Sequence, residues 1–561
     1  MEKRLILAIF LSFLVLFLYQ LLFVKKPVVP PEKEQATQAA TASPTSTPQN
    51  QLPPVSSSTP PDKTKQQELS TSTQLATSQL TPIAADKETE IVVDTPLYRA
   101  VWSNRGGVLK SWQLKQYKDD EGQILDLVSP QAHEIGLYPF RLETGDIEFD
   151  QQIREALFQP STTSLSLQPG EIGELTFTYV QEDGSLVTKS FAFNGDTYVI
   201  DITLQATKNN TSLNPSLIWG PSISHASPVQ QKQRFGSGRG VSVLAGTKVY
   251  HQKEEKLKEN EAAFNFVTWA AYEDNYFAAI FLGQPEKTSA LFRKETAENT
   301  PPVFFLKVTN VHQSYLGPKD FQLLSQFGYQ TKKIIRFGFF GWIAEILLKA
   351  IKGIHQAFPN WGVAIIILTF IIKIIFFPLT YSSTKSMAKM QELQPKIKAL
   401  RAKYKKSKSD IAQRRKMNEE MMKLYKEHGI NPAGGCLPLL IQIPIFWGFF
   451  RMLAVSIEFR HSPFVFWIKD LSVKDPYYVT PILMGITQFI SQKMTPTSAD
   501  PTQQRMMLIM PVIMTIFFMN FQSGLVLYWL TNNVLQIGQQ YIMNKLMHKK
   551  KRVAHGKKRK K

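Results

Sequence analysis

The stretch Ile366-Ile-Leu-Thr369-Phe-Ile-Ile-Lys373-Ile-Ile-Phe-Phe-Pro378 places one lysine in the middle of an apolar run. The whole run, Trp361–Tyr381, is long enough to cross a membrane as a helix that rises about 1.5 Å per residue. A charge at this depth costs about 2.5–3.5 kcal/mol and normally faces a partner or a hydrated cavity. The alternative is that Lys373 snorkels to the cytoplasmic surface, but that surface lies about nine residues away, roughly twice the reach of a lysine stem. We therefore expect Lys373 to be a functional charge inside the membrane.

Further apolar segments predict a multi-pass α-helical membrane protein with six transmembrane helices. For the first segment the alternative is a cleavable signal peptide, but the run ends in Phe23-Val24-Lys25-Lys26 rather than in small residues. Two later segments span about 24 Å as helices against a core of about 30 Å, a mismatch that local thinning of the bilayer relieves. The predicted spans are Leu5–Val24, Trp361–Tyr381, Cys436–Ile457, Val479–Met494, Met506–Phe521 and Gly524–Met543.

The charge distribution predicts the topology. The chain of 561 residues has 65 Lys and Arg against 45 Asp and Glu, a net charge of +20. A folded basic face would indicate nucleic-acid binding, but the excess lies in two blocks, +9 in residues 382–435 and +10 in residues 545–561. Under the positive-inside rule both blocks belong in the cytoplasm. We therefore expect both termini to be cytoplasmic, the large region after the first span to lie outside, and DNA not to be a partner.

The composition divides the chain into segments. Residues 25–88 are rich in Pro, Ser, Thr and Gln, and such a segment cannot bury enough apolar surface to offset its ordering entropy. Glu345, Lys349 and Lys352 recur on one face of an otherwise apolar segment, which favours a helix in the membrane interface over a core helix of the preceding domain. The expected order is an anchor (1–24), a disordered linker (25–88), a β-sandwich domain (89–328), an amphipathic interfacial helix (329–358), a five-helix core (359–544) that contains a helical hairpin (383–430), and a basic tail (545–561).

Residues 89–328 are expected to form a large antiparallel β-sandwich. Thr176–Val180 and Leu186–Phe193 alternate apolar and polar residues around a Glu-Asp-Gly turn, which predicts a hairpin, and Thr197–Ala206 alternates again. We expect Phe264–Leu282 to add a helix. The glycines of 236–240 resemble a phosphate loop only superficially, because their spacing is not G-x-G-x-x-G, and we interpret them as a mobile glycine loop.

The basic block 383–430 is expected to form two helical arms. Pro395 should kink the first arm, Ser409 or Asp410 should cap the second, and Gly429 should end it.

Methionines suggest a function for this hairpin. Apart from Met1, every methionine lies at or after Met387, and methionine suits promiscuous binding surfaces. For any single methionine, core packing is the alternative. The predicted docking residues are Met387, Met390, Met417, Met421 and Met422.

Neutral polar residues are the expected surroundings of Lys373. The apolar spans from Trp361 to Met543 contain no Asp or Glu, apart from Glu458 at the outer boundary of one. Arg451, near the outer end of its span, is expected to snorkel outward. The polar side chains could line a hydrated groove, although each could equally make an ordinary hydrogen bond between helices. The candidates include Gln442, Gln488, Asn532, Asn533 and Gln536.

Several long motifs resemble the YidC/Oxa family of membrane protein insertases. They are Leu393-Gln-Pro-Lys396, the run from Asn431 to Phe446, Asp475-Pro-Tyr-Tyr478, Pro481-Ile-Leu-Met-Gly485 and Ser523-Gly-Leu-Val-Leu-Tyr528-Trp529. The resemblance covers essentially the whole chain and includes the large periplasmic domain of the Gram-negative form. It implies a β-supersandwich, a groove open to the cytosol, and location in the bacterial inner membrane.

The resemblance also implies roles for individual residues and partners. Thr369, Tyr528 and Trp529 match positions near the substrate path of the family, which often has a second tyrosine where Trp529 stands. The family's groove charge is typically arginine, so Lys373 keeps the charge but not the planar fork. The implied partners are nascent membrane proteins, the phospholipid bilayer and the Sec translocon, with the ribosome and targeting factors at the hairpin and tail.

The function predicted from these features is a membrane protein insertase and chaperone, not an enzyme. A secondary transporter or channel would require intramembrane carboxylates or inverted repeats, and we find neither. An enzyme acting through the β-domain would require paired acid and base groups in a pocket, which the sequence does not suggest. The single cysteine, Cys436, excludes a disulfide framework and a cysteine-based zinc site within one chain, and no cofactor or metal is expected.

Overall fold

The computed structural model describes residues 81–224, 238–257, 259–296, 301–404, 410–430, 437–495 and 501–558. The predicted anchor 1–24 and most of the predicted linker lie outside the described residues. Residues 81–88, which the sequence assigns to the linker, pair with the β-domain instead. Ile83 forms a bridge with Val180, and Glu88 forms ion pairs with Arg105 and Lys110.

The described β-domain contains three sheets. A central sheet follows the order β14 (Lys248–Lys253), β13 (Gly240–Ala245), β16 (Val267–Glu273), β17 (Phe277–Gly283), β20 (Val311–Pro318), β10 (Val199–Lys208), β9 (Leu186–Asn194), β8 (Ile172–Val180) and β6 (Gln159–Pro160), with β11 (Thr211–Leu213) on β10. The second is β4 (Ile124–Asp126), β3 (Val108–Lys118), β2 (Tyr98–Ser103), β1 (Glu90–Asp94) and β7 (Ser164–Ser166). The third is β15 (Glu261–Asn265), β18 (Ser289–Glu295), β19 (Val303–Thr309), β12 (Ser216–Trp219) and β5 (Arg141–Glu143).

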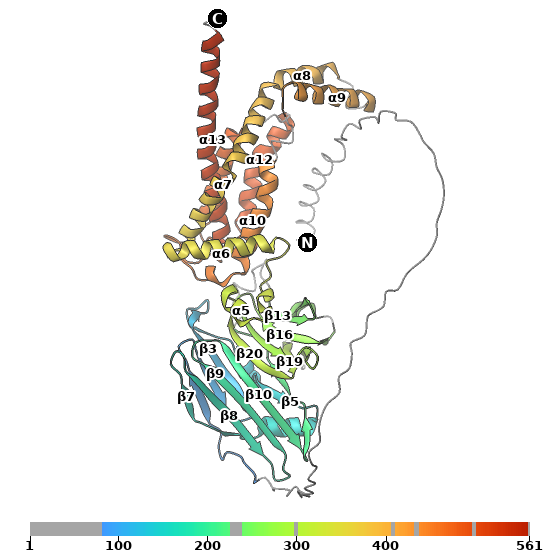
Figure 1. The fold of residues 1–561 in the computed structure, drawn as a ribbon, viewed down its shortest axis with the longest axis vertical. Coiled ribbons are helices and arrows are strands. Elements are labelled where there is room, and N and C mark those ends of the chain that lie inside the picture. Colours follow the sequence, from blue (N-terminus) through green and yellow to red (C-terminus); the bar gives the residue numbers. More distant parts are fainter. Residues whose placement is uncertain are drawn as a thin grey trace, which may run out of the picture. The chain divides into compact units, whose positions relative to one another are not determined.

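The predicted hairpin is confirmed as β8 and β9, and the next alternating stretch is β10; the three strands run side by side (Figure 1). All strand pairs described are antiparallel except β1 with β7. Every second residue of β9 is buried, so its apolar face packs on the core. Short helices α2 (Pro130–Ile135), α3 (Ile147–Glu155) and α5 (Phe321–Phe327) and the 3₁₀ turns η1 (Glu254–Lys256) and η2 (Thr331–Ile334) complete the domain.

The expected helix at Phe264–Leu282 is wrong. The segment forms the end of β15 and the strands β16 and β17, joined by a turn in which Asp274 accepts hydrogen bonds from the amides of Tyr276 and Phe277. Because β17 is buried on both faces, its sequence has no alternation, and periodicity cannot separate such a strand from a buried helix.

The C-terminal half is helical. Its elements are α6 (Gly341–Ala357), α7 (Trp361–Glu392), α8 (Gln394–Lys403), α9 (Ile411–Glu427), α10 (Leu437–Val455), the 3₁₀ turn η5 (Ile457–Phe459), α11 (Val479–Met494), α12 (Pro501–Phe518) and α13 (Ser523–Lys558). Among the described residues, α7 is the one helix both long and apolar enough to span a membrane by itself. Shorter apolar stretches occur at Leu440–Val455 and Leu508–Phe518.

Two helices are longer than expected. α7 continues past Tyr381 to Glu392, and α13 continues without a break into the basic tail. The first arm of the hairpin is interrupted at Leu393, where α7 ends and α8 begins, as expected of Pro395, which lies in the first turn of α8, where its missing N–H costs no helical hydrogen bond. Asp410 caps α9 by accepting from the amides of Ala412 and Gln413, as expected. Gly429 follows the end of α9 with a φ of 60°.

Polar contacts join the β-domain to the helices. Lys352 of α6 lies between Asp320, 2.9 Å away, and Glu458, 2.6 Å away. Arg460 donates to the carbonyl of Lys118 at 2.6 Å. The guanidinium of Arg451 donates to the carbonyl of Arg336, in the segment between η2 and α6.

Candidate functional site

Lys373 of α7 donates a hydrogen bond from Nζ to Oε1 of Gln536 on α13, over 2.8 Å. Both side chains are half-buried, and α7 packs directly against α13. No carboxylate of the described residues forms an ion pair with Lys373. Within the part of the chain that the structure describes, the cation is therefore held by a neutral acceptor, and no carboxylate compensates its charge.

Three other predicted residues share this part of α13. Trp529 donates from Nε1 to Oε1 of Gln488 on α11 at 3.2 Å, and Asn533 donates from Nδ2 to the carbonyl of Met484 on α11 at 3.2 Å. Asn532 is buried. With a helical repeat of 3.6 residues, positions 529, 533 and 536 lie along one side of α13. This side contacts α11 through two residues and α7 through Gln536.

Thr369 and Tyr528 pack inside the helical bundle. The hydroxyl of Thr369 donates to the carbonyl of Ile365 at 2.6 Å, within its own helix. The ring of Tyr528 is buried and stacks on Phe449 of α10, with the centroids 4.1 Å apart. Gln442 of α10 is half-buried, and no hydrogen bond between it and Lys373 is present among the described side chains. Of the predicted site residues, Lys373 and Gln536 thus form a charged centre, whereas Thr369 and Tyr528 take part in the packing of the helices.

Of the partners on α11, Gln488 was one of the polar candidates for the groove lining, whereas Thr487 was not. Gln488 is the acceptor of Trp529, and Thr487 lies 3.5 Å from the amide of Asn533. Gln488 stands four residues after Met484, so both face the same neighbouring helix. That spacing of a polar residue in a short apolar segment was the available signal.

The five predicted docking methionines lie in different environments. Met390 is buried with Leu393, Ile397 and Ile430 in a small core of the hairpin, and Met421 packs against this core. Met387 and Met417 are half-buried, and Met422 is 37% exposed. Packing accounts for Met390 and Met421, whereas Met422 presents its side chain to the surroundings.

Comparison with known proteins identifies relatives along the whole chain. A family model described as "YidC periplasmic domain" matches residues 90–350, and one described as "60Kd inner membrane protein" matches residues 353–551. A "Membrane protein insertase YidC" of Syntrophus aciditrophicus is 37% identical over 97% of this chain and 100% of its own length. The protein of the same name in Geobacter sulfurreducens is 41% identical over 81% of this chain and 85% of its own.

A solved structure described as "Active YidC insertase crystal structure with the first transmembrane domain resolved" aligns with 82% of this chain and 93% of its own. The identity is 20% and the TM-score is 0.34, so the relationship of this chain to known proteins rests on the sequence comparisons.

Proposed function

The chain belongs to the YidC family of membrane protein insertases, and we propose that it inserts nascent proteins into the bacterial inner membrane and assists their folding. The observation that carries the mechanism is the hydrogen bond between Lys373 and Gln536. It supports a groove in which one positive charge attracts acidic or dipolar parts of a substrate.

The neutral partner makes this charge available. A carboxylate in place of Gln536 would neutralise Lys373, whereas an amide oxygen satisfies one of the three N–H groups and leaves the charge. A carboxylate on a passing chain can therefore replace the amide in a stronger, charge-assisted hydrogen bond. Gln536 is on α13 and Lys373 is on α7, and we propose that substrates leave between these two helices. The exchange therefore loosens one contact along the exit path.

The path begins on the cytoplasmic side. We propose that apolar nascent segments first contact the hairpin, where Met422 is exposed, and then move into the groove near Lys373. Met387, Met390, Met417 and Met421 stay part of this proposal as the supporting surface. Thr369, Tyr528, Trp529, Gln442, Asn532 and Asn533 would shape the groove and its packing. Burial of the substrate's apolar segment and the membrane potential would supply the free energy.

The proposed topology has six spans with cytoplasmic termini and a periplasmic β-domain. α11, at 16 residues, is about 24 Å long against a hydrocarbon core of about 30 Å, which supports a locally thinned bilayer around the groove. The basic hairpin and tail suit anionic headgroups and the ribosome, and we propose that the protein acts alone or with the Sec translocon.

A secondary transporter or channel remains the second candidate, but the apolar spans after Trp361 carry none of the carboxylates that proton-coupled transport uses. An enzymatic role has no support in a metal centre, since the described residues contain no cluster of three His, Cys, Asp or Glu side chains that could hold one.

Reconstitution without the Sec translocon tests the proposal. The full chain in proteoliposomes should protect the outer segment of a single-span substrate from added protease, and empty liposomes should not. A parallel assay of proton and ion flux should show no substrate-independent conductance. Absence of protection would contradict the insertase proposal, and a steady flux would favour the channel.

A further inference from the structure

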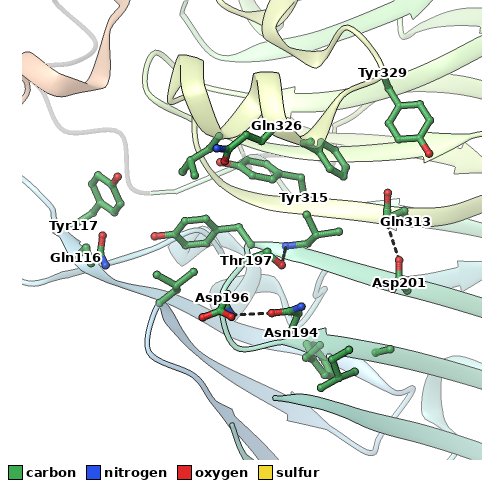
Figure 2. Close-up of a pocket in the computed structure, with 18 residues that line it drawn as sticks. Gln116, Tyr117, Asn194, Asp196, Thr197, Asp201, Gln313, Tyr315, Gln326 and Tyr329 are labelled. Atoms are coloured by element: carbon green, nitrogen blue, oxygen red, sulfur yellow. Dashed lines mark hydrogen bonds between the residues drawn. The ribbon is translucent and has the colours of Figure 1, made fainter. Parts of the chain in front are cut away.

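The β-domain contains a cavity of about 640 Å³ that the groove does not involve. Its walls come from the end of β3, the turn between β9 and β10, the middle of β20, and α5 with the segment that follows it. In Figure 2, Tyr117 and Tyr329 lie at opposite sides of this space, with Tyr315 between them and Gln326 reaching in from α5. The volume falls in the range of about 300–1,000 Å³ typical of small-molecule sites.

Aromatic rings form much of the wall. The rings of Tyr198 and Tyr315 are 6.0 Å apart, and Phe327 lies 5.5 Å from Tyr315. The hydroxyl of Tyr315 donates to the carbonyl of Pro318 at 2.6 Å, which fixes that ring in place. Because Tyr198 and Tyr315 are only 3% and 2% exposed, they form the floor of the cavity. The aromatic surface open to a ligand is that of Tyr117, Phe327 and Tyr329.

The polar groups of the wall are amides and carboxylates. They are Gln116, Asn194, Asp196, Asp201, Gln313 and Gln326, and the lining residues that the structure describes include no Lys, Arg or His. Gln313 donates to Asp201 at 2.6 Å, and Asn194 accepts from the backbone amide of Asp196 at 2.8 Å. These bonds orient the side chains and leave further donor and acceptor positions unused.

We propose that this cavity binds an uncharged, hydroxyl-rich ligand, such as a short oligosaccharide. Adjacent hydroxyl groups of a sugar both donate and accept, and paired amide and carboxylate groups satisfy both needs. The C–H faces of sugar rings match flat aromatic walls. An anionic ligand is disfavoured because Asp196 and Asp201 are present without a cation in the lining.

The negative charge of the cavity wall indicates that the cavity and the groove bind different ligands. A substrate segment acidic enough to be attracted by Lys373 would be repelled by Asp196 and Asp201. The cavity is therefore an independent site, and failure of one proposal leaves the other intact.

Tyr329 offers a clean test. Its ring is exposed at the rim, with the residue 53% accessible, while its backbone carbonyl accepts a hydrogen bond from Nε1 of Trp269 at 3.2 Å. Tyr329→Ala should therefore remove the ring without moving the chain. Tyr250 of β14, 40% exposed and outside the cavity, gives a matched control as Tyr250→Ala.

The experiment is calorimetric titration of the full chain, held in a detergent without a sugar headgroup, with oligomers of glucose and of N-acetylglucosamine. We expect saturable binding of at least one series, weakened about tenfold by Tyr329→Ala and by Asp196→Ala, and unchanged by Tyr250→Ala. Thermal unfolding of each variant checks the fold. The proposal is overturned if neither series binds, if both cavity variants bind as the wild type does, or if tetramethylammonium or an acidic peptide binds instead.

Discussion

Nζ of Lys373 and Oε1 of Gln536 lie 2.8 Å apart and join α7 to α13. This is a bond between a cation and a neutral amide, in a pair of helices whose apolar segments contain no carboxylate. The arrangement stabilises the ammonium group and keeps its charge. The proposed attraction of acidic substrate segments to the groove depends on that combination.

Substitutions of Gln536 distinguish the effect of the charge on Lys373 from the effect of side-chain packing. Gln536→Glu should place a carboxylate against Lys373, keep the thermal stability, and reduce insertion of an acidic substrate because the charge is neutralised. Gln536→Asn, which stays neutral, is the control and should retain most of the activity. Gln536→Leu should cost about 1.5–3 kcal/mol of stability, since the ammonium loses its acceptor. Equal insertion by the Glu and Asn variants would contradict the proposed role of the charge.

The hairpin methionines should respond differently to truncation. Met390→Ala should leave a cavity in the hairpin core, cost about 2 kcal/mol or more, and lower the hydrogen-exchange protection of α8 and α9. Met422→Ala should leave that protection unchanged and reduce crosslinking of a nascent chain to the hairpin. If Met422→Ala crosslinks as well as wild type does, this side chain is not a docking residue.

Lys352 is predicted to stabilise the contact between α5, α6 and η5. Its Nζ reaches both Asp320 and Glu458, and the side chain of Glu458 is only 8% exposed. Lys352→Met should lower the free energy of unfolding by about 2 kcal/mol, because it leaves a buried carboxylate without its partner. Adding Glu458→Gln should restore part of the loss. A double variant as unstable as the sum of two independent losses would exclude this coupling.

The buried carboxylate of Glu273 should make the stability of the β-domain sensitive to acid. Burial alone would raise the pKa of Glu273, but Lys319, 2.8 Å away, and Arg336 lower it to about 2. A carboxyl group whose pKa falls on folding stabilises the protein above its unfolded value near 4.5, and that contribution is lost as the pH falls from 4.5 towards 2. Glu273→Gln should cost about 3–5 kcal/mol at neutral pH and flatten the pH dependence of thermal unfolding in this window.

A second titratable group, His251, contributes to the pH dependence of stability over a different pH range. Burial and the nearby Arg336 lower the pKa of His251 from 6.5 to about 4, so stability should also fall between pH 6.5 and 4. Glu273, whose Oε1 lies 3.8 Å from Nδ1 of His251, raises the pKa of His251, so in Glu273→Gln this loss should persist and extend to lower pH. An unchanged slope below pH 4.5 in that variant would show that Glu273 is not its origin.

Features encoded by neighbouring residues could be predicted from the sequence. The alternation in β9 gave its buried face, and the cap of α9 falls at Asp410, one of the two residues expected. The fully buried β17 was missed because burial on both faces removes the alternation that identifies a strand. The end of α7 was placed too early, since the polar residues after Tyr381 continue the helix rather than end it.

The site could be predicted only as a group of candidates. Gln536 was one of several polar residues that could meet Lys373, and the two are 163 positions apart in the chain. Which residue faces the lysine depends on the rotation and packing of α13, which local sequence does not determine. For the same reason, the bond from Arg451 to the carbonyl of Arg336 could not be foreseen.

The most direct test of the central claim is insertion of a single-span substrate with an acidic outer segment into proteoliposomes containing wild type, Lys373→Arg or Lys373→Glu. Wild type and Lys373→Arg should insert the substrate, whereas Lys373→Glu should insert it poorly and should recover when the outer segment is made neutral. Full insertion of the acidic substrate by Lys373→Glu would contradict the account.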